Sequence, residues 1–428
     1  MRYILCLAVA LFWSASAAAA DFSADMGPFA DVLAADKSYS PEERKAAEAA
    51  FADLEAKAND ISPAAFQLAV AHIAALAHNG HTMLLAGAWQ HQFNRTALQY
   101  HQFADGLYVV GGPDAMHDLV GARVIAIDGR SAADLVKAFG DYFGGREGKR
   151  DEWAPFLLES PALLHAAGLA KADSHVEVTF ETLNGRRMTL GLLAAMDPPK
   201  GELLEYLDYS RLLTMAKANV AGGMPFYLTS PERALLNAPM PELDAHYMHL
   251  RINKSFYDQK IETFMAEARA AIAKGKPKHL ILDLRLDGGG DLNTTRDFMQ
   301  ALPTLAPGKI FVLTSGRTFS AAIASAGYLK QAASDRVVIV GEPIGDHLEF
   351  WAEGGIVKLP TSSAMLWYST ERHNYMSGCP EADCHSSIRD APIRVQSLEP
   401  DITAPLTYAD YRAGRDPALA AIKKILGK

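Results

Sequence analysis

The chain has 428 residues, with 41 Lys or Arg, 50 Asp or Glu and a formal net charge of −9 at pH 7. This charge, without a basic cluster, excludes the electrostatic pattern of a nucleic-acid-binding protein, so no nucleic acid is expected as a partner. The length is too great for one ordinary hydrophobic core, so two or three domains are expected.

Residues 1–20 have the pattern of a secretory signal peptide. Arg2 precedes an apolar run over 3–13, and small residues over 14–20 lead up to Asp21. The apolar run is shorter than the roughly 20 residues that a membrane-spanning helix needs. We therefore expect cleavage, a periplasmic or secreted protein, and no integral membrane segment after cleavage.

Two cysteines, Cys379 and Cys384, remain after removal of the signal peptide. An exported protein folds where disulfides persist, so a small disulfide loop is expected. The alternative is a metal site, because His373 and His385 flank the pair. The C-x-x-C spacing of such sites is absent, so no metal and no other cofactor is expected.

Residues 21–100 are expected to form an N-terminal helical region. Apolar residues recur at helical spacing, and the pairs Ser40-Pro41 and Ser62-Pro63 are typical of a cap followed by a first helical turn. Asn79-Gly80 then predicts the end of the second helix, which leaves His81 just outside it.

Residues 101–195 change to short β runs and are expected to form a middle domain. Asn184-Gly185 predicts a hairpin between the last two runs. The pattern G-x-x-V-x-x-I-x-G over 121–129, followed by a helix-forming segment, resembles the PDZ domain, a carboxylate-binding type. An ordinary hairpin and helix packed on the core is the alternative.

Residues 196–245 are rich in proline and are expected to be a linker with helical pieces. From 246 to 428, strands alternate with helices, and this pattern predicts a layered α/β core. Strands are expected at 247–252, 279–284, 309–313 and 336–340, and helices at 257–274, 294–302 and 320–333.

A run of three glycines follows the strand expected at 279–284. Since glycine has no side chain, the backbone N–H groups of Gly288 and Gly289 can point into a site. A phosphate-binding loop is the alternative, but the spacings G-x-x-x-x-G-K-[ST] and G-x-G-x-x-G are both absent.

Ser320 opens the helix expected at 320–333. The positive end of a helix dipole stabilises a developing negative charge there, and the N–H of Ala321 is free to donate. Serine is also a good N-cap residue, so this position alone does not assign a nucleophile.

Together these two segments resemble the tail-specific, or C-terminal-processing, serine peptidases, and within them the tricorn core protease branch. In that family a D-L-R-x-N-x-G-G strand end supplies one oxyanion donor, and a T-x-S-A motif supplies the nucleophile and the second donor. The likeness covers about 247–345, and the segments at 79–82, 399–402 and 414–417 are also family-like. It implies an α/β (α+β multidomain) fold with an N-terminal helical region, a PDZ-like β-rich middle domain and a layered ClpP/crotonase-like α/β catalytic core.

The resemblance implies Ser320 as the nucleophile, with an oxyanion hole from Gly288, Gly289 and Ala321. The lysine branch of the family carries its lysine in G-E-x-x-x-G-K, where this chain has His347, so a Ser-Lys dyad is excluded. His81 matches the histidine of the tricorn branch and is the expected base; His347 is the alternative base.

Two departures from the tricorn branch concern the groups around its histidine. Gly80 stands where that branch has a serine, and no glutamate stands clearly where it has one, Glu399 being only nearby. The expected function is that of an exported serine endopeptidase acting on a peptide or protein substrate. A non-catalytic peptide-binding relative and another acyl hydrolase on the same scaffold are the alternatives, and the sequence indicates no oligomeric state.

Overall fold

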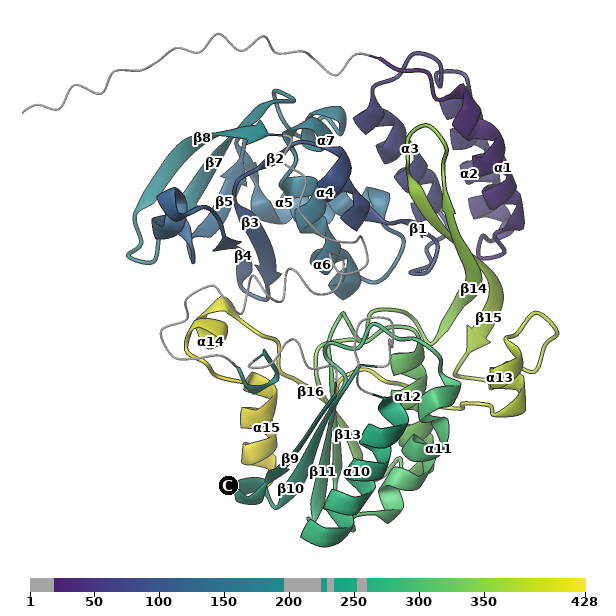
Figure 1. Ribbon diagram of the computed structural model, residues 1–428, viewed down its shortest axis with the longest axis vertical. Coiled ribbons are helices and arrows are strands. Elements are labelled where there is room, and N and C mark those ends of the chain that lie inside the picture. Colours follow the sequence, from purple (N-terminus) through teal and green to yellow (C-terminus); the bar gives the residue numbers. More distant parts are fainter. Residues whose placement is uncertain (1–18, 196–224, 229–234, 252–259) are drawn as a thin grey trace, which may run out of the picture.

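The computed structural model describes residues 19–195, 225–228, 235–251 and 260–428. Most of the predicted signal peptide (1–18) and most of the predicted linker (196–224 and 229–234) lie outside the described residues. Figure 1 shows three parts: helices at the N-terminal end, a middle sheet, and a second sheet flanked by helices.

The N-terminal part contains α1 (Ser23–Ala35), α2 (Pro41–Glu55) and α3 (Pro63–Ala75). Both predicted helix starts are confirmed, because Ser40 and Ser62 cap α2 and α3 through their side chains. The helical part ends earlier than the expected residue 100. From residue 83 onward the chain forms β1 (Met83–Leu84), α4 (Trp89–Gln92), β2 (Arg95–Thr96) and β3 (Gln99–Phe103). The strands β1 and β2 pair with segments far along the chain, so the local pattern did not reveal them.

The middle sheet has the strand order β2-β8-β7-β5-β4-β3, with β6 paired to β5. The predicted hairpin is present, formed by β7 (His175–Glu181) and β8 (Arg187–Ala195) around Asn184-Gly185. The predicted strand-and-helix unit is also present, and its PDZ-like nature stays a prediction. The other elements are β4 (Gly106–Gly111), β5 (Arg123–Ile127), β6 (Arg130–Ser131), α5 (Ala132–Ala138), α6 (Glu147–Leu158) and α7 (Pro161–Ala166).

The core sheet has the order β16-β13-β12-β11-β10-β9, parallel except for β9. Its strands are β9 (Leu235–Met240), β10 (Ala245–Leu250), β11 (His279–Asp283), β12 (Ile310–Thr314), β13 (Val337–Gly341) and β16 (Ile402–Thr403). Helices α10 (Ile261–Gly275), α11 (Asn293–Ala301) and α12 (Ala321–Ala332) cover one face, and α15 (Pro417–Ile425) covers the other (Figure 1). The predicted α/β alternation is confirmed.

The core sheet begins before the boundary expected at 245/246, because β9 pairs with β10 along its full length. Pro239 lies in β9, and proline is tolerated in an edge strand because one side of such a strand needs no ladder hydrogen bonds. The proline content that predicted a linker is therefore compatible with a strand at this edge.

A long hairpin joins the core to the N-terminal helices. It consists of β14 (Glu349–Lys358) and β15 (Met365–Asn374) and reaches up beside α1 and α3 in Figure 1. Near its tip, Leu359 and Leu366 pack with the N-terminal helices, and Asp25 of α1 accepts hydrogen bonds from the backbone of the turn. At its base, Phe350 and Tyr375 pack in the core cluster. The hairpin thus connects the N-terminal helices to the core.

The expected disulfide between Cys379 and Cys384 is present, just before α13 (Ser386–Asp390). The last elements are α14 (Tyr408–Arg412) and α15. Within the described ranges, no helix has both the length and the apolar character needed to cross a membrane.

Candidate active site

Ser320 lies in the turn between β12 and α12 with φ 53° and ψ −123°. A positive φ is uncommon for a residue with a side chain, and such backbone outliers gather at functional sites. The hydroxyl makes no capping hydrogen bond to α12. An N-capping role therefore does not account for the serine at this position, and the strained turn favours a functional role.

His81 forms a buried ion-pair contact with a residue that the sequence analysis missed. Its Nδ1 lies 3.0 Å from Oδ2 of Asp346, and both side chains are fully buried. A carboxylate at Nδ1 holds the ring proton there, which leaves the lone pair on Nε2. The Nε2 of His81 is buried and has no hydrogen-bond partner among the described residues. This arrangement suits a general base with its orienting carboxylate.

The second carboxylate oxygen of Asp346 is also engaged, because Oδ1 accepts the backbone N–H of His347 at 2.9 Å. Asp346 lies in the segment that carries the lysine in the other branch, one position before His347. The imidazole of His347 is exposed, whereas that of His81 is buried. Of the two candidate bases, only His81 is oriented by a carboxylate in the part of the chain that the structure describes.

The ring of His81 lies between two aromatic rings. Its centroid is 4.1 Å from that of Phe319 and 4.9 Å from that of Phe350, and both pairs are stacked. Phe319 directly precedes Ser320, so this stack brings the His81 ring beside the turn that carries the predicted nucleophile.

The backbone around His81 is held by the β14–β15 hairpin. Asn79 accepts the N–H of Trp351 at 3.0 Å and donates from Nδ2 to the carbonyl of the same residue at 3.0 Å. Two residues after His81, β1 pairs with β15. The hairpin therefore clamps the histidine segment from both sides.

The glycine at position 80 has a physical reason. A Cβ there would lie 2.7 Å from Oδ2 of Asp346 and 3.0 Å from the ring of Phe319. The carboxylate of Asp346 thus fills the space that a side chain at position 80 would need. Asp346 contacts the His81 ring and could orient it, whereas Glu399 is an exposed partner of Arg146 at 2.8 Å.

The predicted oxyanion segment lies against Ser320. A Cβ on Gly289, which has φ 98°, would be 2.6 Å from the Cβ of Ser320 and 3.0 Å from the N of Ala321. Ala321 begins α12, so its N–H has no acceptor within the helix. The N–H of Gly289 donates to Oδ1 of Asp287 at 3.0 Å, while a Cβ on Gly288 would meet nothing within 4 Å.

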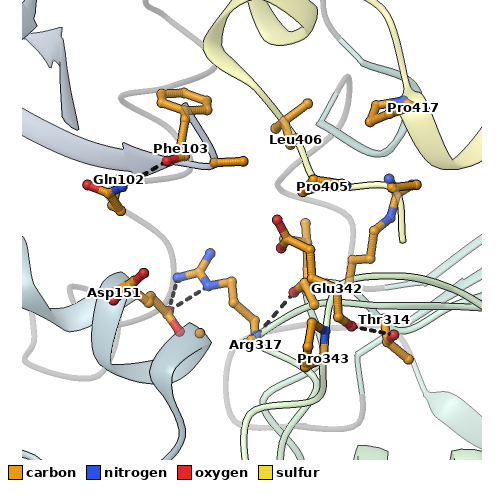
Figure 2. A pocket seen from close by; sticks show the side chains of 18 of the residues that line it. Gln102, Phe103, Asp151, Thr314, Arg317, Glu342, Pro343, Pro405, Leu406 and Pro417 are labelled. Carbon is orange, nitrogen blue, oxygen red and sulfur yellow. Dashed lines mark hydrogen bonds and ion pairs between the residues drawn. The ribbon is translucent and has the colours of Figure 1, made fainter. Parts of the chain in front are cut away.

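A cavity of about 390 Å³ lies next to this turn, between the middle sheet and the core. It opens at the carboxyl ends of the parallel strands, where α/β sheets commonly bind ligands. Residues 314–317, which lead to Ser320, form part of its wall. Ser320, His81 and Asp346 do not line it. In Figure 2, Arg317 and Glu342 extend into the cavity.

Two carboxyl groups that line the cavity, those of Glu342 and Glu152, have shifted pKa values. Burial raises the pKa of the Glu342 carboxyl. Burial acts in the same direction on Glu152, but the neighbouring Arg317 and Lys149 outweigh it and lower the pKa of Glu152 to about 2. Glu152 is therefore ionised at neutral pH and is an ion-pair partner of both Arg317 and Lys149.

No family model and no curated protein matches this sequence. Among solved structures, a CPAF mutant with a serine replaced by alanine has a TM-score of 0.59 at 13% identity, over 95% of this chain and 96% of that chain. Mature CPAF complexed with lactacystin has a TM-score of 0.56 at 12% identity, over 95% of this chain and 97% of that chain.

The photosystem II D1 C-terminal processing protease is 16% identical over 94% of this chain and 97% of that chain, with a TM-score of 0.38. The CPAF structures show that this chain has their fold along nearly its whole length. The multidomain α/β fold expected from the family resemblance is thereby confirmed.

Proposed function

We propose that the protein is an exported serine endopeptidase that cleaves peptide bonds through Ser320. The observation that carries this proposal is the buried His81–Asp346 pair, whose free Nε2 belongs to a ring stacked on the residue before a strained serine. The fold shared with CPAF, a structure of which has a serine replaced by alanine, is compatible with it. Triads are recognised by geometry and role, and their order in the chain varies.

In the first step, His81 Nε2 removes the proton of the Ser320 hydroxyl while Oγ forms a bond to the carbonyl carbon of the substrate. The carbonyl oxygen becomes an oxyanion, and Asp346 stabilises the imidazolium that forms. The imidazolium then gives its proton to the leaving amine as the peptide C–N bond breaks. Water, activated by the same histidine, releases the acyl group from Ser320.

The oxyanion is held by the N–H of Ala321 and by a second donor from the glycine segment. In this structure the N–H of Gly289 is engaged by Asp287. The second donor is therefore Gly288, or Gly289 after it leaves the Asp287 carboxylate. Both glycines are among the donors that the sequence predicts.

The substrate is a peptide or protein segment that runs past Ser320, with the neighbouring 390 Å³ cavity open to one of its side chains. The disulfide is compatible with a periplasmic or secreted location. The middle domain, proposed to be PDZ-like, forms one wall of the cavity through β3 and α6.

The test uses a fluorophosphonate probe, which labels activated serines, together with cleavage of an unstructured protein such as casein. We expect labelling and cleavage by the wild type and neither by Ser320→Ala, while Ser397→Ala, at an exposed serine, behaves as the wild type. Labelling without peptide cleavage would favour the acyl hydrolase. No labelling at all would favour the non-catalytic peptide-binding relative.

A further inference from the structure

Three side chains with metal-binding atoms gather near the base of the β14–β15 hairpin. They are Glu353 of β14, His373 of β15, and His385, which follows the disulfide. One ligand atom of each lies within 4.8 Å of the other two. Two imidazoles and one carboxylate form a donor set that Zn²⁺ commonly uses.

The imidazole of His373 is buried and directed toward Glu353. Only 2% of the residue is exposed, and its Nδ1 lies 3.2 Å from the hydroxyl of Tyr375. Its Nε2 lies 3.4 Å from Oε1 of Glu353 yet makes no hydrogen bond with any described residue. A ring held by an outer partner at one nitrogen, with the other nitrogen facing a carboxylate, is the usual arrangement of a histidine ligand.

His385 completes the set. Its ring stacks on that of His373 with 5.2 Å between centroids, and its Nδ1 is buried without a hydrogen-bond partner in the described chain. The backbone fixes it there, because the N–H of His385 donates to the carbonyl of Arg372 at 3.0 Å. The Cys379–Cys384 disulfide closes the loop before it and removes both thiols from any ligand set.

The backbone of β14 is irregular at Glu353. The pairing of β14 with β15 shifts register on both sides of Glu353, which has φ 67°. Such bulges redirect a side chain, and a positive φ is uncommon for glutamate. The strand therefore departs from regular pairing at the residue whose carboxylate reaches His373.

We propose that Glu353, His373 and His385 bind one Zn²⁺ ion, with water in the fourth position. The Oε2 of Glu371 lies 4.0 Å from Nε2 of His385, on the side of the ring away from the free Nδ1, so Glu371 is an outer neighbour of this ligand. The ion connects β14, β15 and the disulfide loop, so it braces the hairpin that clamps the His81 segment. Binding of Zn²⁺ does not depend on whether the chain cleaves peptides.

A column of rings connects the two sites. The ring of Phe350 stacks on His373 at 4.8 Å and on His81 at 4.9 Å between centroids. The proposed ion would therefore hold the far end of the stack that positions the histidine of the candidate active site.

The test is titration of ZnCl₂ into the oxidised mature protein after treatment with EDTA, followed by calorimetry and by thermal unfolding. We expect one ion per chain and a higher melting temperature with Zn²⁺, but not with MgCl₂, because Mg²⁺ prefers an all-oxygen shell. Glu353→Gln and His385→Asn should each weaken Zn²⁺ binding about tenfold or more, a loss seen even for outer partners of metal ligands.

His175→Ala is the matched control, at an exposed histidine of the middle sheet, and should bind Zn²⁺ as the wild type does. Far-UV circular dichroism shows whether each variant is folded, and His385→Asn keeps a polar side chain at a partly exposed position for that purpose. Absence of stoichiometric binding by the wild type would overturn the proposal. Unchanged affinity in folded Glu353→Gln and His385→Asn would also overturn it.

Discussion

The two halves of the candidate active site are built in different ways. Ser320 and the glycine segment follow β12 and β11, which are adjacent strands of one parallel sheet. His81 comes instead from the N-terminal part, 265 residues before its partner Asp346, and reaches the core through the β14–β15 hairpin. The nucleophile half therefore depends on local geometry, whereas the base half depends on packing between distant segments.

The largest effect is expected from removing either half. Ser320→Ala and His81→Ala should each lower kcat to the residual level left by oxyanion stabilisation and binding, about 10³ to 10⁴ over the reaction in water. The double variant should be little worse than either single one, since members of one catalytic unit are not additive. Steady-state cleavage of a fluorogenic peptide measures all three rates.

The free energy of unfolding tells a catalytic role of Ser320 from a structural one. Ser320→Ala should change it by less than about 0.5 kcal/mol, because the hydroxyl makes no cap bond. A denaturant titration that shows a loss above about 1 kcal/mol would point back to a structural role for Ser320.

The next effect tests the orientation of the base. Asp346→Asn should lower kcat by about 10⁴, because an amide oriented by the N–H of His347 favours the wrong ring tautomer of His81. His347→Ala should keep most of the activity, since only its backbone contacts Asp346. If His347→Ala abolished cleavage and His81→Ala did not, His347 would be the base.

A smaller effect is expected from crowding the base. Gly80→Ser places a Cβ where Asp346 and Phe319 now lie, so the imidazole must shift. Misplacement by about 1 Å can lower a rate about 10²-fold, and overpacking costs about 1 to 3 kcal/mol of stability. Gly191→Ser is the control, because a Cβ on Gly191 meets nothing within 4 Å. Equal rates for these two variants would show that the space around position 80 is not restrictive.

The smallest effect concerns the cavity beside the nucleophile. Burial raises the pKa of Glu342, so the folded state favours the neutral carboxyl over the carboxylate. The stability that the neutral carboxyl contributes is fully present below the pKa of the unfolded chain. It is lost as the pH rises through the pKa of the folded chain. Glu342→Gln should therefore be more stable than the wild type at pH 8, with the difference vanishing in acid. Urea titrations across this range measure it. A difference that grows in acid would contradict the assignment.

The sequence predicted the elements around Ser320 correctly because their signals are local. The strand, the glycines and the helix start at Ser320 lie within one α/β unit, and caps such as Ser40 are equally readable. The position of His81 after the end of a capped helix was also predicted correctly, whereas its role as the base stays a prediction. Asp346 was missed because no periodicity connects residues 265 positions apart.

The hairpin β14–β15 was missed for the same reason. Its pairing with β1 and its packing on α1 are tertiary, and its strands carry the bulge at Glu353 instead of a regular alternation. At Pro239 the sequence predicted a linker where the structure has a strand, because a proline typical of loops lies in an edge strand.

The distance along the chain between His81 and Asp346 has a consequence for the order of synthesis. A chain made from its N-terminus exposes His81 early, but the carboxylate and the hairpin that hold it are made only when residues 346–374 follow. A nascent chain therefore carries the serine turn without an oriented base. In the proposed mechanism, hydrolysis would therefore begin only after residues 346–374 have been made and have folded onto the N-terminal part.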